Sequence, residues 1–167
     1  MYFDFSKSIL VLSKQKEGKN MQVYDNKKPF INRQILIDLK EMNSTKTLES
    51  TITFMRDLYD SKFLCAMLSR GKRGDSEAFS PYLLNCYDED DTYYLPIFTN
   101  ELEVLKASKE FEQYTTYLLE FDDILNLFTA INGETPISLV IDPYGTQYTI
   151  TSSMLKIATE TLENADK

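Results

Sequence analysis

Residues 62–68 constrain the fold more than any other part of the sequence, because every residue after Lys62 is apolar. A strand with one solvent-exposed face alternates apolar and polar residues, whereas this run presents apolar side chains to both faces of a sheet. We therefore predict that residues 62–68 form a central strand that is covered on both sides.

Residues 137–150 predict a β-hairpin. Two β-prone runs, 137–141 and 146–150, flank the sequence Asp-Pro-Tyr-Gly at residues 142–145, and these residue types at these positions are preferred in a type I turn. We expect the turn to constrain Gly145 conformationally, as a positive φ angle would. Because a tight hairpin joins antiparallel strands, the sheet cannot be entirely parallel.

The spacing of apolar residues predicts helices that begin at Ser44 or Thr45, at Thr99 or Asn100, at Asp122, and at Ser152 or Ser153. The first three should end near Tyr59, Lys109 and Asn132. The side chains expected to face the core are Leu48, Ile52, Met55 and either Leu58 or Tyr59, then Ile124, Leu125 and Phe128, and finally Leu155, Ala158 and Leu162.

Three further strands are predicted, at residues 79–87, 93–98 and 115–119. Strands that alternate with helices, together with the hairpin, indicate the α+β class. We expect a single domain in which a mixed β-sheet is covered by helices and which ends in a C-terminal β-hairpin and a terminal helix. A length of 167 residues suits one such domain.

The N-terminal part of the chain differs from the rest. Residues 9–12 and 21–24 are predicted to pair as a hairpin with a long polar loop, and residues 33–42, preceded by Asn32 as a cap, fit either a helix or a strand. We therefore divide the chain into a basic extension, residues 1–43, and an α+β domain, residues 44–167.

Charge is distributed unevenly between these parts. The net charge is −8, and residues 1–40 carry eight basic against four acidic residues, so residues 1–40 are +4 and residues 41–167 are −12. An acidic body repels nucleic acid and anionic membrane, so we expect a basic or neutral protein partner. The basic arm should either pack against the acidic body or offer a contrasting surface to a partner. Docking on the body would depend on its apolar residues, which are Ile9, Leu10, Val11, Leu12, Ile35, Leu36 and Leu39.

The absence of histidine excludes imidazole chemistry, including a Ser-His-Asp triad and a zinc site with His ligands. Cys65 and Cys86 lie in apolar contexts and are expected to be buried thiols, neither a disulfide nor a metal site. The sequence shows no basic leader with an apolar core and no run of about 20 apolar residues, which indicates a cytoplasmic protein. We expect no cofactor and no enzyme activity.

Three short motifs have matching order and spacing with a bacterial family. They are Leu-Pro-Ile-Phe-Thr at residues 95–99, Phe-Asp-Asp-Ile-Leu at 121–125 and Ile-Asp-Pro-Tyr-Gly at 141–145. With these motifs the chain resembles the N-terminal domain of the SseB family (enhanced serine sensitivity protein B), from about Lys46 to Glu160. The family usually has Asn at the position of Asp142. The resemblance implies a cytoplasmic bacterial α/β domain without an established enzyme activity, and therefore no catalytic residues to transfer.

Two charged segments are candidate sites. Asp88, Glu89, Asp90 and Asp91 lack the spacing of a calcium loop, so a solvated turn that contributes, with Tyr93, to an interaction surface is the better interpretation. Arg70, Lys72 and Arg73 lie in a loop with two glycines and are a weak candidate for an anion site, since the loop lacks the spacing of a phosphate-binding motif.

Two further residue groups are better explained by structure than by function. Asp122 and Asp123 diverge on a helix, which favours capping over catalysis. The tyrosines Tyr93, Tyr94, Tyr114, Tyr117, Tyr144 and Tyr148 are typical of binding surfaces, but half-buried strand positions explain them better.

The sequence therefore predicts a non-catalytic, cytoplasmic protein-interaction module of SseB type, with its oligomeric state open. One alternative is an immunity-like acidic inhibitor whose residues 88–134 mask a basic protein. The other is a small hydrolase that uses carboxylates or magnesium.

Overall fold

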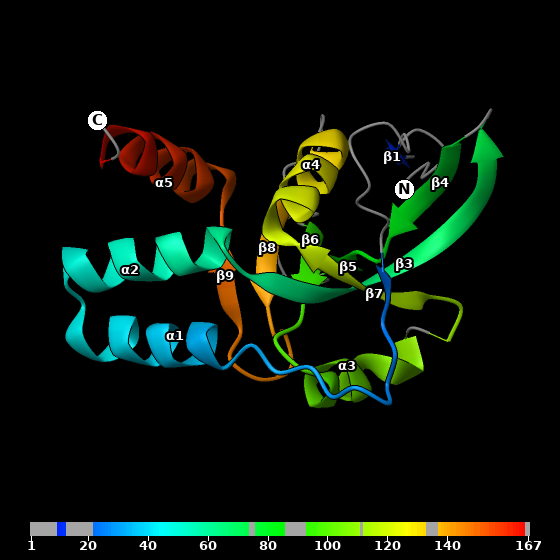
Figure 1. Ribbon diagram of the computed structural model, residues 1–167, viewed down its shortest axis with the longest axis horizontal. Coiled ribbons are helices and arrows are strands. Elements are labelled where there is room, and N and C mark those ends of the chain that lie inside the picture. The colour runs from blue at the N-terminus through cyan, green and yellow to red at the C-terminus, as the bar shows by residue number, and fades with distance from the viewer. Residues whose placement is uncertain are drawn as a thin grey trace.

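The strand predicted at residues 62–68 is β3 (Lys62–Arg73), which lies at the centre of the structure (Figure 1). The computed structural model describes residues 10–12, 22–73, 76–85, 93–110, 112–132 and 137–165. Within these residues, β3 is the middle strand of a five-stranded antiparallel sheet. The order across this sheet is β1 (Leu10–Leu12), β4 (Ser76–Pro81), β3, β7 (Thr115–Glu120) and β2 (Gln22–Val23).

A second, four-stranded sheet contains the C-terminal hairpin. Its order is β5 (Leu84–Asn85), β6 (Tyr93–Ile97), β8 (Ile137–Ile141) and β9 (Tyr148–Ile150). β8 and β9 pair in antiparallel fashion, as predicted, whereas β6 and β8 are parallel, so this sheet is mixed. The predicted α+β class is confirmed, with the strands arranged in two sheets.

Helices cover both faces of the strands (Figure 1). α1 (Arg33–Thr45), α2 (Leu48–Tyr59) and α5 (Ser152–Ala165) lie side by side at one end of the molecule. α4 (Phe121–Ile131) lies over one face of the strands, and α3 (Glu101–Ala107) lies on the other. The predicted terminal helix is therefore present as α5.

Alternate residues of β3 enter two separate clusters of buried side chains. Phe63, Cys65 and Met67 belong to the larger cluster, which includes residues of α1, α2, α4, α5 and the four-stranded sheet. Leu64 and Ala66 belong to the smaller cluster on the side of α3. All five side chains are at most 1% exposed, so the prediction of a doubly covered strand is confirmed.

A reciprocal pair of backbone hydrogen bonds joins the two sheets. Leu64 N–H donates to the carbonyl of Phe98, which follows β6, and Phe98 N–H donates to the carbonyl of Leu64, each over 2.9 Å. Both residues are completely buried. The end of β6 is therefore held directly against the central strand.

The basic arm is packed onto the rest of the chain where the structure describes it. Residues 33–42 form a helix, and Asn32 caps it by accepting a hydrogen bond from Ile35 N–H over 3.3 Å. Ile35, Leu39 and Met42 lie in the larger core cluster. β1 and β2 also join the five-stranded sheet, as the docking of the arm requires.

The predicted N-terminal hairpin is wrong. β1 pairs with β4 and β2 pairs with β7, so the two strands lie at opposite edges of the five-stranded sheet. Local β-propensity marked both strands correctly but does not select their partners. The polar segment between them has no short turn signal that would fix a hairpin register.

Three helix starts differ from the prediction because another residue supplies the cap or the anchor. Thr151 caps α5 in place of Ser152 or Ser153, since its hydroxyl oxygen accepts a hydrogen bond from Met154 N–H over 3.2 Å. Thr47 caps α2, since its hydroxyl oxygen accepts a hydrogen bond from Ser50 N–H over 3.2 Å, and the predicted caps belong to the last turn of α1. α4 begins at Phe121, so Asp122 is not the cap and lies in the first turn. Phe121 is fully buried and its N–H donates to Ser61 O, which fixes this earlier start.

The strand predicted at residues 79–87 is divided between β4 and β5. Pro81 ends β4, which is consistent with the missing N–H of proline, and Tyr82 N–H donates instead to Ala66 O over 2.9 Å. The cap predicted at Asn100 is confirmed, because its side-chain oxygen accepts a hydrogen bond from Glu103 N–H over 3.1 Å.

The turn between β8 and β9 has the predicted location, but the residue with the unusual backbone conformation is not the predicted one. Gly145 N–H donates to Asp142 O over 2.9 Å, which closes the turn. The positive φ expected at Gly145 is wrong, because Asp142 has it instead, at 47°. A Cβ atom at Gly145 would lie 2.6 Å from Oε2 of Glu103, so a larger residue there requires the end of the Glu103 side chain to shift.

Leu39→Ala should lower the free energy of unfolding by about 2–5 kcal/mol, because Leu39 is 1% exposed and its truncation leaves a cavity in the larger core cluster. Ile37→Ala is the matched control on the same helix. Ile37 is 56% exposed, so its loss should change stability by less than about 0.5 kcal/mol. Urea unfolding of both variants measures the difference, and equal midpoints would show that α1 does not form part of the core.

Candidate functional site

The acidic residues Asp88, Glu89, Asp90 and Asp91 lie outside the described residues. Tyr93, the other member of that predicted surface, is half-buried at the start of β6 and packs against the larger core cluster. Its place in the strand agrees with the structural interpretation of the tyrosines.

The candidate anion site around Arg70 was predicted to be a loop, but the structure places it in a strand. Arg70, Lys72 and Arg73 belong to β3, and the backbone of Lys72 and Arg73 is paired with β4. Gly71 has φ of +83° and lies where the register shifts between Ser69 and Lys72, as in a β-bulge. Arg70 is exposed, and its strand continues the sheet instead of forming a phosphate-binding loop.

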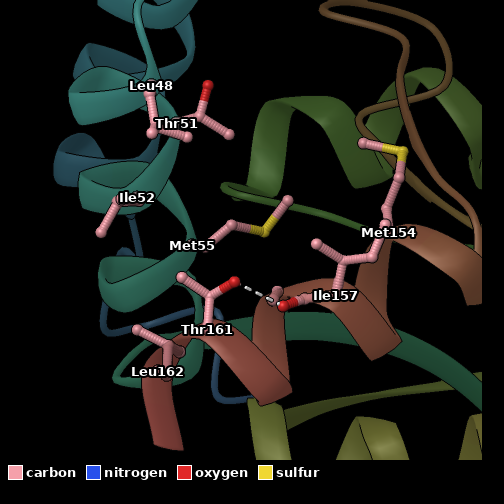
Figure 2. A pocket seen from close by; sticks show the side chains of 9 residues that line it. Leu48, Thr51, Ile52, Met55, Met154, Ile157, Thr161 and Leu162 are labelled. Atoms are coloured by element: carbon pink, nitrogen blue, oxygen red, sulfur yellow. Dashed lines mark hydrogen bonds between the residues drawn. The ribbon is translucent and has the colours of Figure 1, made fainter. Parts of the chain in front are cut away.

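An apolar hollow lies between α2 and α5, and we call it the α2–α5 groove (Figure 2). It has a volume of about 170 Å³. Figure 2 shows Met55 extending from α2 into the space between the helices, with Ile157 on the opposite side. The lining residues are Leu48, Thr51, Ile52, Met55, Met154, Ile157, Ala158, Thr161 and Leu162.

The polar atoms of the groove are bonded within their own helices. The hydroxyl of Thr51 donates to Thr47 O over 3.0 Å, and the hydroxyl of Thr161 donates to Ile157 O over 2.8 Å. The threonines therefore need no hydrogen bond from a ligand, and the groove suits an apolar one. Leu48 at 76% and Ile157 at 63% exposed are large apolar side chains that water surrounds in the isolated chain.

α2 carries two apolar stripes, and sequence reasoning recognised them as one. Phe54 and Leu58 are fully buried in the core, whereas Leu48 and Ile52, predicted to face the core, line the groove instead. The signal was present in the sequence, because α2 has more apolar residues than one core-facing stripe requires. The same holds for α5, where Leu155 and Ala158 are buried as predicted while Met154 and Ile157 form a second stripe. Leu162, also predicted to be buried, is half-buried and lines the groove.

A buried polar contact lies at the carboxyl ends of the parallel strands β6 and β8. Asp142 is 1% exposed, and its carboxylate accepts hydrogen bonds from Thr99 N–H over 2.9 Å and from the Thr99 hydroxyl over 2.6 Å. Burial raises the pKa of Asp142, the Thr99 bonds oppose this, and nearby Glu103 raises it further. Sequence reasoning treated Asp142 only as a turn residue and missed this contact.

Asp38 is a second buried carboxyl, between α1 and α2. It is 4% exposed, and its Oδ1 accepts a hydrogen bond from Gln34 Nε2 over 2.8 Å. Burial raises the pKa of Asp38, Gln34 lowers it, and the neighbouring carboxyls of Asp57 and Glu41 raise it again. These groups are structural neighbours within two packed helices and do not line the groove.

The described residues offer little to hold a metal or to act as a nucleophile. Among them, no group of three or more Cys, Asp or Glu side chains is placed to bind a metal ion. Cys65 is completely buried, and burial raises the pKa of its thiol to about 12, so the predicted buried thiol is confirmed for Cys65. Cys86 lies outside the described residues.

Comparison of the chain with family models, with curated proteins and with solved structures gives no match. None of the described helices is long and apolar enough to cross a membrane. The SseB resemblance therefore remains a prediction.

Asp142→Ala should lower the free energy of unfolding by about 2–4 kcal/mol, because it removes both Thr99 hydrogen bonds and places alanine at a positive φ. Asp142→Asn is the matched control. Asparagine tolerates this backbone and can keep a hydrogen bond to Thr99 without burying a charge, so it should be at least as stable as wild type at neutral pH. Thermal unfolding measures both variants, and an equal loss in the two would contradict the role given to the contact.

Asp38→Asn should be more stable than wild type at neutral pH, and the difference should shrink as the pH falls through the raised pKa of the folded state towards 3.8, the ordinary pKa, and stay constant below it. The folded wild type binds a proton at Asp38 more tightly than the unfolded chain does, so protonation stabilises the wild type at low pH. This stabilisation is lost as the pH rises through the pKa of the folded state, whereas asparagine does not titrate. Urea unfolding at several pH values measures the effect. Glu112→Gln at an exposed site is the control, and a difference for Asp38→Asn that does not depend on pH would contradict the prediction.

Proposed function

We propose that this chain is a non-catalytic protein-interaction module of SseB type, acting in the cytoplasm, and that its α2–α5 groove binds an amphipathic helix of a partner protein. The observation that carries the proposal is the exposure of Leu48 and Ile157 on an apolar groove whose hydroxyl groups are already bonded. Contiguous apolar surface of this kind is typical of interaction sites. A helix that lays its apolar face into a groove is a common mode of recognition.

Charge selects the partner. Residues 41–167 carry a net charge of −12, and the whole chain carries −8. A second copy of the chain would bring the same negative charge to the interface, and like charges oppose association. A helix with basic residues beside its apolar stripe would be attracted instead, so the proposed partner is a basic amphipathic helix.

Ile157→Asp should weaken the binding of a designed basic amphipathic helix about tenfold or more, because the new carboxylate must be buried in the apolar groove. The probe is a fluorescein-labelled peptide of leucine and lysine in helical periodicity, and fluorescence anisotropy measures its affinity. The substitution also makes the protein more acidic, so a general electrostatic attraction would instead become stronger.

Two controls separate groove binding from general attraction. Ile37→Asp places the same charge at an exposed isoleucine of α1 outside the groove, and it should leave the affinity within about twofold of wild type. A scrambled peptide of the same composition has no apolar stripe and should bind more weakly. Equal binding by the two peptides, or equal effects of the two aspartates, would overturn the proposal.

A further inference from the structure

A second hollow lies at the turn between β8 and β9, and none of its lining residues belongs to the α2–α5 groove. We call it the tyrosine cleft. It has a volume of about 600 Å³. Its lining residues are Tyr82, Leu83, Leu84, Asn85, Glu110, Pro143 and Tyr144.

Hydrogen bonding and ring packing hold Tyr82 in the cleft. Its hydroxyl donates to Oε2 of Glu110 over 2.5 Å, and its ring packs edge-on against Tyr114, with centroids 5.4 Å apart and an interplanar angle of 85°. Burial raises the pKa of Tyr82, and the hydrogen bond and charge of Glu110 raise it further, so the phenol remains a hydrogen-bond donor at neutral pH. The contact fixes the position of the Glu110 carboxylate beside an aromatic ring.

The buried contact between Asp142 and Thr99 anchors the turn that contributes Pro143 and Tyr144 to the cleft. Asp142 begins the turn, and the next two residues, Pro143 and Tyr144, line the cleft. Tyr144 is 39% exposed, so part of its side chain is open to solvent. The anchored turn therefore contributes a partly exposed aromatic ring to the cleft that Tyr82 and Glu110 also line.

We propose that the tyrosine cleft binds the guanidinium group of an arginine in a basic segment of a partner protein. Aromatic faces attract cations, and the Glu110 carboxylate accepts hydrogen bonds from a guanidinium group. Leu83 and Leu84 provide apolar surface for the methylene groups of the side chain. Arginine suits the cleft better than lysine, because a planar guanidinium group both stacks on a ring and donates several hydrogen bonds in a fixed geometry.

A partner protein could supply the cation that pairs with the Glu110 carboxylate. Among the described residues, no Lys or Arg forms a salt bridge with Glu110, whereas Glu103 is paired with Lys106 over 2.6 Å. The charge of −12 on residues 41–167 attracts a basic segment at long range. The cleft would then provide the specific contact for one of its arginines.

The test is an NMR titration of the full chain with capped arginine and, separately, with capped lysine and capped norleucine. Capped arginine should produce saturable shifts at Tyr82, Tyr144 and Glu110 and should bind more tightly than lysine, with no comparable shifts from norleucine. Glu110→Gln should weaken arginine binding about fivefold. Glu112→Gln removes the same charge from a nearby exposed site that does not line the cleft, and it should change the affinity by less than about twofold.

A peptide arm distinguishes a protein segment from free arginine as the source of the guanidinium group. A short peptide of alternating glycine and arginine should bind more tightly than capped arginine and than the corresponding lysine peptide, and Tyr144→Ala should weaken it. Ile157→Asp in the α2–α5 groove should leave this binding unchanged, so failure of the groove proposal would not affect the result. Equal losses for Glu110→Gln and Glu112→Gln, equal affinities for arginine and lysine, or shifts confined to other surfaces would overturn the inference.

Discussion

The burial of β3 on both faces is the constraint on which the rest of the structure depends. Phe63, Cys65 and Met67 require cover on one side, and Leu64 and Ala66 require it on the other. One layer of helices cannot provide both, so the chain places α4 on one face and α3 on the other (Figure 1). The reciprocal hydrogen bonds between Leu64 and Phe98 then attach the second sheet to the strand that needs this cover.

The contact between Asp142 and Thr99 extends this constraint to the surface. Thr99 follows Phe98, which is bonded to the central strand, and Asp142 follows β8, which is parallel to β6. A carboxylate at 1% exposure is costly unless it is hydrogen-bonded, and Thr99 provides two donors from one residue. The turn that carries Tyr144 is thus connected to the buried centre of the molecule through the Thr99 contact and through the hydrogen bond from Asp142 N–H to Ile97 O over 3.0 Å.

Sequence patterns predicted the elements whose signals are local. The apolar run of β3, the turn at residues 142–145 and the cap at Asn32 each depend on residues close together in the chain, and the structure contains all three. Strand partners are not local, which is why β1 and β2 were expected to pair with each other. The burial of Asp142 was not predictable for the same reason, because its partner Thr99 lies 43 residues earlier.

The candidate sites show a related limit. Helical periodicity identifies apolar positions on α2, but it does not say which of two stripes meets the core and which remains exposed. That choice is made by Phe54 and Leu58, which are 0% exposed, and it leaves Leu48 on the surface. An exposed apolar groove is a risk for self-association, and the net charge of −8 reduces this risk through repulsion between copies. The acidic composition and the apolar groove are therefore compatible in one chain, because the charge that keeps two copies apart also attracts a basic partner.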